Sequence, residues 1–135
     1  MNRKECGQLL ARVVAFCPAQ SVDEFTAEAW LIALGDTSYT DATEAVNHLG
    51  ALELEPGRTR YIEPGHIRHE VRRIRRQRLD TAPVIEPPSG LDGQEYLDWS
   101  RRTRAAIADG HTPTPPVGAL VRKPLHLAIT KGIDQ

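Results

Sequence analysis

Six arginines crowd one short stretch of the chain. Residues 64–79 read PGHIRHEVRRIRRQRL and contain a single carboxylate, Glu70. At about 100° per residue, Ile67, Val71 and Ile74 fall on one edge of a helix, and the guanidinium groups spread over the remaining surface. This pattern predicts a helix that buries an aliphatic edge and presents a basic face. The arginines of that face are Arg68, Arg72, Arg73, Arg75 and Arg76.

The basic face has two interpretations. Like charges three and four residues apart cost a few tenths of a kcal/mol each, and contact with phosphates would relieve that repulsion and release counterions. An acidic protein surface would serve as well. The competing interpretation is a face that is merely solvated, or paired with carboxylates of the protein itself. Because Gln77 is the only amide side chain among the arginines, contact with the DNA backbone is favoured over readout of bases.

The charge distribution supports a segregated basic patch. The whole chain carries a net charge of −1, yet residues 1–57 hold 3 basic and 9 acidic side chains and residues 58–78 hold 8 and 2. A near-neutral total therefore conceals an acidic segment followed by a basic one.

Catalytic and metal-binding patterns are weak. His66 and His69 stand three residues apart, a spacing that can ligate zinc, but no further ligand follows at a characteristic distance, so two surface histidines are expected. There is no glycine-rich phosphate loop and no Gly-x-Ser-x-Gly motif. Cys6 and Cys17 would lie about 16 Å apart along one helix, too far for a disulfide. We predict a protein that is not an enzyme and has no cofactor or metal.

Hydrophobic periodicity predicts an all-α protein. Helices are expected over residues 2–17, 23–34, 40–50 and 64–79, which together form a small four-helix domain spanning residues 1–80. Ser21 to Glu24 match a capping box for the second helix, and Ser38 or Thr40 would cap the third. The second helix is expected to bury five side chains: Phe25, Ala29, Trp30, Ala33 and Leu34.

Residues 81–135 have a different character. Seven of the ten prolines lie between residues 80 and 135, which predicts a largely disordered tail. One helix is expected within it, at about 91–109, with Ser89 as its cap and Gly110 as its end. Tyr96, Leu97 and Trp99 on this helix are either anchors for a partner protein or side chains that fold back onto the first domain.

Several short motifs follow one another along the chain. They are Ala27-Glu-Ala-Trp30, Tyr39-Thr-Asp-Ala42, Ala45-Val-Asn-His48, Tyr61 to Ile67, Arg72 to Leu79, Tyr96-Leu-Asp-Trp99 and Ala105 to Gly110. Their order resembles the phage and prophage replicative-helicase loader-and-inhibitor family, and in particular the small replication proteins of actinobacterial phages. The resemblance covers about residues 1–80, and the tail motif is also similar.

The resemblance implies a helical N-terminal domain, an unstructured C-terminal part and binding to the replicative hexameric helicase. The resulting expectation is a non-enzymatic DNA-replication adaptor that also contacts DNA phosphates or a replication initiator. The alternative is a DNA-binding regulator that uses the helix over residues 64–79. A structural protein or an inhibitor of a host enzyme is a third interpretation. Because no long apolar run is present, we expect no membrane association and a cytoplasmic location.

Overall fold

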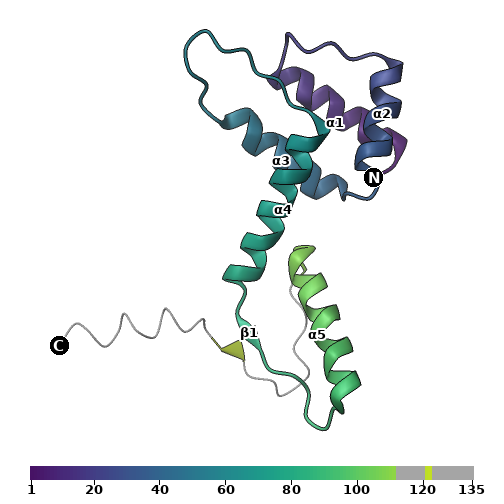
Figure 1. The fold of residues 1–135 in the computed structure, drawn as a ribbon, viewed down its shortest axis with the longest axis vertical. Helices are drawn as coiled ribbons and strands as arrows, with labels where there is room; N and C mark the ends of the chain where they lie inside the picture. Colours follow the sequence, from purple (N-terminus) through teal and green to yellow (C-terminus); the bar gives the residue numbers. More distant parts are fainter. Residues whose placement is uncertain (112–120, 123–135) are drawn as a thin grey trace, which may run out of the picture. The chain divides into compact units, whose positions relative to one another are not determined.

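The computed structural model describes residues 1–111 and 121–122, and the part it describes is helical (Figure 1). The expected all-α class is confirmed. The five helices are α1 (Arg3–Phe16), α2 (Glu24–Leu34), α3 (Tyr39–Ala51), α4 (Pro64–Thr81) and α5 (Gly93–Ala108). Two short strands, β1 (Val84–Ile85) and β2 (Val121–Arg122), pair antiparallel. None of the described helices is long and apolar enough to cross a membrane.

The chain divides into two compact units, Met1–Ile74 and Arg75–Gln135. The division falls inside α4, whereas the sequence suggested a domain boundary after residue 80. Residues 112–120 and 123–135 of the predicted tail lie outside the described residues, so the disorder expected there stays a prediction.

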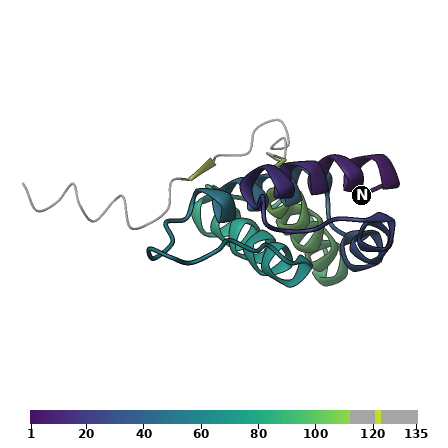
Figure 2. The same ribbon diagram turned by 90° about the horizontal axis from the view of Figure 1, so that it is seen from above.

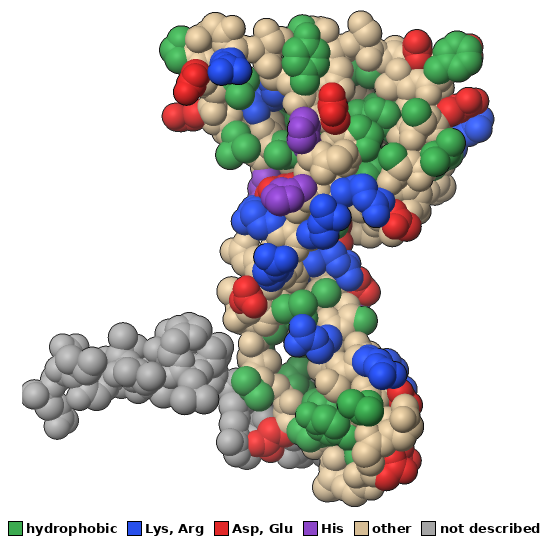
Figure 3. All heavy atoms as spheres, viewed as in Figure 1, with side chains coloured by type: hydrophobic (Ala, Val, Ile, Leu, Met, Phe, Trp, Pro, Cys, Tyr) green, Lys and Arg blue, Asp and Glu red, His purple; other side chains and the backbone are tan. Residues whose placement is uncertain are grey.

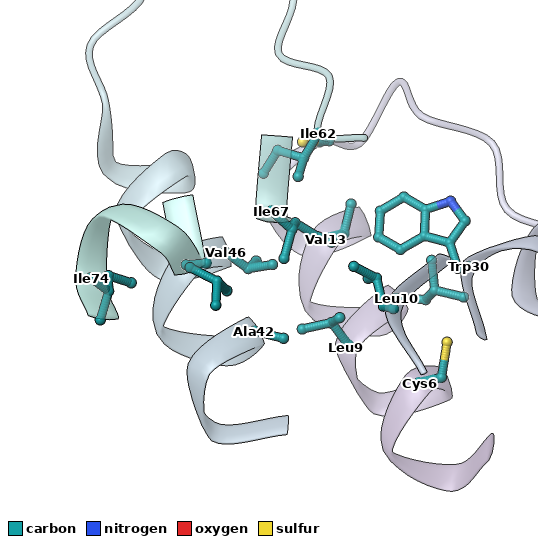
Figure 4. Packing of buried hydrophobic residues seen from close by; sticks show 14 residues of the cluster. Cys6, Leu9, Leu10, Val13, Trp30, Ala42, Val46, Ile62, Ile67 and Ile74 are labelled. Atoms are coloured by element: carbon teal, nitrogen blue, oxygen red, sulfur yellow. The ribbon is translucent and has the colours of Figure 1, made fainter. Parts of the chain in front are cut away.

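The core of the first unit is built around α1. Asn2 and Glu5 form a capping box at the start of α1, and the helix ends just before Pro18. In Figure 2, α1 is seen lengthwise and α2 nearly end-on, so the two helices cross steeply. Figure 4 shows side chains from α1, α2, α3 and the start of α4 meeting in one cluster. Its buried members include Leu9, Leu10, Val13, Trp30, Leu34, Val46, Ile67, Val71 and Ile74.

Two local features close this core. Gln20 holds the backbone of Ile62 through two hydrogen bonds, accepting from its N–H at 3.0 Å and donating to its carbonyl at 2.8 Å. Gly50 lies against the Phe16 ring so closely that an added Cβ would stand 2.4 Å from it. A side chain at position 50 would therefore push α3 away from α1.

The start and the outer face of α2 differ from the prediction. Asp23, rather than Ser21, is the N-cap, and it forms a capping box with Thr26 because its extended backbone aims the carboxylate at the free amide of that residue. Phe25 and Ala29 were expected inside, but both are exposed. Apolar residues occupy most of the circumference of this helix, so periodicity could not indicate which side would be covered, and α2 turns Trp30 and Leu34 inward.

The second unit is organised around α5. Asp92 and Glu95 cap the helix in place of the predicted Ser89, and Gly110 ends it with a φ of 83°. The Arg78 guanidinium donates to the Ala108 carbonyl at 2.9 Å. The predicted helix over residues 91–109 is thus present, and it folds with side chains of its own unit.

Candidate partner-binding surfaces

Arg68 is the first residue of the predicted basic face, and it is engaged within the first unit. Its guanidinium lies 2.8 Å from the Asp36 carboxylate and donates to the Ala33 carbonyl at 2.7 Å. The hydrogen bond and the charge of Arg68 lower the pKa of Asp36. Arg68 therefore connects the start of α4 to the end of α2. A cation at the C-terminal end of a helix also interacts favourably with the helix dipole.

Arg73 belongs to a second internal network. Glu70 is almost fully buried and accepts two hydrogen bonds from Arg73, at 3.0 and 2.6 Å. His48 on α3 lies 3.1 Å from the same carboxylate oxygen. The hydrogen bond from Arg73 is the main reason that the pKa of Glu70 is lowered, and burial acts in the opposite direction. The network ties α3 to α4, although about half of the Arg73 side chain remains exposed.

Arg75 and Arg78 make their contacts within the second unit. Arg75 lies 2.6 Å from the Asp109 carboxylate, and Arg78 binds the Ala108 carbonyl. Both contacts bring positive charge to the C-terminal end of α5, where the helix dipole is negative and Asp109 adds a further negative charge. These arginines therefore stabilise α5.

Arg72 and Arg76 remain. Both are exposed, and neither has an ion pair within the described part of the chain. They stand four positions apart on α4, and His69 precedes Arg72 by three and Arg76 by seven, so helical periodicity puts all three on one face. Figure 3 shows Lys and Arg side chains gathered over α4. Of the five arginines predicted to bind a partner, three are engaged internally, and the other two have no ion pair with the residues that the structure describes.

The aromatic motif of α5 differs in exposure along its length. Tyr96 and Leu97 are each 47% exposed. Trp99 is half-buried and lines a hollow with Pro83 and Ile107, and its ring is tilted against that of Tyr96 with centroids 6.0 Å apart. Tyr96 and Leu97 are therefore open to solvent, whereas Trp99 is partly covered within the unit and supports Tyr96.

The histidine and cysteine side chains that could act as ligands or nucleophiles have structural roles. His66 accepts a hydrogen bond from the Glu63 amide at 3.1 Å, immediately before α4. Cys6 and Cys17 are free and buried, and burial raises the pKa of both thiols, which keeps them protonated and unreactive. Across residues 1–111 and 121–122, no three His, Cys, Asp or Glu side chains gather as a metal site would require.

Sequence reasoning missed one exposed surface altogether. Phe25 is 71% and Ile32 is 87% exposed, and the two residues stand seven positions apart on α2. The available signal was the composition of α2, in which apolar residues occupy most of the circumference of the helix.

Comparison of the chain with protein families, characterised proteins and solved structures finds no match to any of them.

Proposed function

We propose that this protein is a non-enzymatic DNA-replication adaptor of the helicase-loader type, with the replicative helicase as its partner. The observation that carries the proposal is the outward pair Tyr96 and Leu97 on a capped helix. An aromatic and an aliphatic side chain that stay half exposed beside each other are typical of protein-binding anchors. The order of motifs along the chain supports the choice of helicase as the partner.

The helix α5 would bind as a formed element. Its N-terminus has a complete capping box, and its C-terminus is held by Arg75 and Arg78. A helix that is already ordered loses less conformational entropy on binding than a segment that folds on its partner. In this proposal, Trp99 maintains the position of Tyr96 and contributes to binding indirectly.

Co-purification with the replicative helicase of the same genome tests the proposal. The wild-type chain should retain the helicase, and the double variant Tyr96→Ser, Leu97→Ser should lose at least about tenfold in affinity, since two interface anchors are removed. Val84→Ser is the matched control because Val84 is exposed to a similar degree in the same unit. Equal retention by the wild type and the double variant would refute the role of α5.

The second candidate is a DNA-binding regulator that uses α4. It is favoured by one observation: Arg72 and Arg76 are exposed and have no carboxylate partner within residues 1–111 and 121–122. Because the other arginines of the face are engaged, we expect few phosphate contacts and weak binding with a small salt dependence.

A further inference from the structure

An apolar stripe on the outer side of α2 has no role in the fold. Phe25 and Ile32 point away from the core, and Ala29 lies between them on the same side of the helix. Trp30 and Leu34 occupy the opposite side and are buried. Large apolar side chains in this position are uncommon on a protein that has nothing to bind there.

The stripe is bordered by negative charge. Glu24 and Glu28 are exposed, and neither has an ion pair within the part of the chain that the structure describes. Residues 21–36 contain four carboxylates and no lysine or arginine; Asp36 is paired with Arg68, and Arg3 of α1 lines a hollow with Glu24 and Glu28 but forms no ion pair with either among the described residues. Figure 3 shows apolar and acidic side chains next to one another at the α2 side of the first unit, with a Lys or Arg side chain beside the acidic ones at its edge.

This charge argues against a symmetric pair of identical chains. A twofold interface would put the α2 of one copy against the α2 of the other. Because residues 21–36 hold no lysine or arginine, the α2 of a second copy would have no basic side chain to pair with Glu24 and Glu28, and bringing two acidic helices together costs binding energy. A partner protein that carries basic side chains beside its apolar contact residues would instead be attracted by Glu24 and Glu28.

We infer that the outer face of α2, formed by Phe25, Ala29 and Ile32 and bordered by Glu24 and Glu28, binds an amphipathic helix of a partner protein. The apolar side of that helix would cover Phe25 and Ile32, as helices pack along their side-chain ridges. Lysine or arginine residues on its flank would meet the two glutamates. This surface belongs to the first unit, whereas Tyr96 and Leu97 belong to the second.

A pair of designed peptides tests this inference with the full chain. The probe is a helical peptide of about 18 residues, or five turns, with leucines along one side and lysines along its flanks. Its counterpart carries glutamates in place of the lysines. We expect the basic peptide to bind and the acidic peptide to bind at least about tenfold more weakly, and binding of the basic peptide should weaken with added salt.

Substitutions locate the binding site. Phe25→Ser with Ile32→Ser should weaken binding of the basic peptide at least about tenfold, and Glu24→Gln with Glu28→Gln should weaken it several-fold and reduce its salt dependence. The control is Leu52→Ser with Leu54→Ser, two residues that are also exposed in this unit, and it should bind like the wild type. Circular dichroism should show all variants folded, because none of the substituted side chains is buried.

Three results would overturn the inference: no binding of the basic peptide, equal binding of both peptides, or binding that is indifferent to the Phe25 and Ile32 substitutions. Self-association of the wild-type chain that those two substitutions abolish would also overturn it, because the occupant would then be a second copy. The helicase co-purification with the Tyr96 and Leu97 variants is a separate measurement, so failure of one does not decide the other.

Discussion

At the scale of residues, the main surprise is the number of guanidinium groups that serve the fold. A carboxylate close to an arginine forms a stable ion pair when ordering the two side chains costs little conformational entropy and the pair is partly shielded from water. Asp36, Glu70 and Asp109 do this for Arg68, Arg73 and Arg75. Only one of these carboxylates, Glu70, is within a few residues of its arginine in sequence. The spacing on one helix could reveal that pair, but the other two depend on tertiary contacts.

Glu70 makes the stability of the first unit depend on pH. Its pKa in the folded protein is lowered, mainly by the hydrogen bond from Arg73. The carboxylate therefore stabilises the fold fully above its unfolded-state pKa of about 4.3, and this stabilisation is lost as the pH falls through the lower folded-state pKa. We expect Glu70→Gln to lower the free energy of unfolding by about 1–3 kcal/mol at pH 7. The difference from wild type should shrink at pH 3.

Urea unfolding at the two pH values measures this effect. Glu55→Gln is the control, because Glu55 pairs with Arg58 only at 3.9 Å and both side chains are largely exposed. Its stability should equal that of the wild type at both pH values. A penalty for Glu70→Gln that is the same at pH 3 as at pH 7 would contradict the prediction.

Gly50 is required by close packing rather than by backbone conformation. Alanine is a better helix former than glycine by about 0.5–1 kcal/mol, but a Cβ at position 50 would collide with the Phe16 ring. We expect Gly50→Ala to destabilise the protein by about 1–3 kcal/mol. Gly7→Ala is the matched comparison on α1, where nothing lies within 4 Å of the added atom, and it should raise stability. Thermal unfolding of both variants checks the prediction, and a stabilised Gly50→Ala variant would contradict it.

At the scale of elements, α4 has two duties. Its aliphatic edge completes the core of the first unit, and its arginines connect it to α2, α3 and α5 through separate partners. Most arginines of the helix that was predicted to dock on a partner therefore stabilise the fold. What it leaves for a partner is the face of His69, Arg72 and Arg76.

DNA binding by α4 should have a small salt slope. Each neutralised phosphate contributes about 0.9 to the fall of log K with log salt, so contact through Arg72 and Arg76 alone predicts a slope of about −2. Fluorescence anisotropy of a labelled duplex across a salt series measures it. Arg72→Ala with Arg76→Ala should abolish binding, whereas Arg58→Ala, which removes a largely exposed arginine outside α4, should not. A slope near −5 would mean that the internal ion pairs open to release all five arginines.

At the scale of the whole molecule, the two units differ in how much they bury. The first unit has a core of fourteen buried side chains, whereas Ala108 is the one buried apolar residue among residues 75–111 of the second unit. Local opening is cheaper where little apolar surface is covered. The second unit is therefore expected to open more readily than the first.

Native-state hydrogen exchange tests this difference. Amides of α1 and α3 should exchange slowest, and those of α5 faster. Arg78→Ala should accelerate exchange in α5 further, because it removes the hydrogen bond to the Ala108 carbonyl. Exchange in α5 that is as slow as in α1 would contradict the expectation.

The sequence by itself determined the helices of this protein. Apolar periodicity, Pro18, Pro64 and Gly110 predicted all five to within a few residues, because helix formation and termination depend on side chains that are close in the chain. The sequence did not identify the N-cap of α2 correctly. Both Ser21 and Asp23 can cap a helix, and the extended backbone at Asp23 makes the aspartate the N-cap.

Tertiary structure alone decided which surfaces are available. Phe25 and Trp30 are both apolar and both on α2, and only the crossing of α1 and α2 buries one and exposes the other. In the same way, Arg68 and Arg72 are alike in sequence, but Asp36 reaches only Arg68. The reason is physical: burial and ion pairing depend on groups brought from distant parts of the chain, and those distances are set by packing.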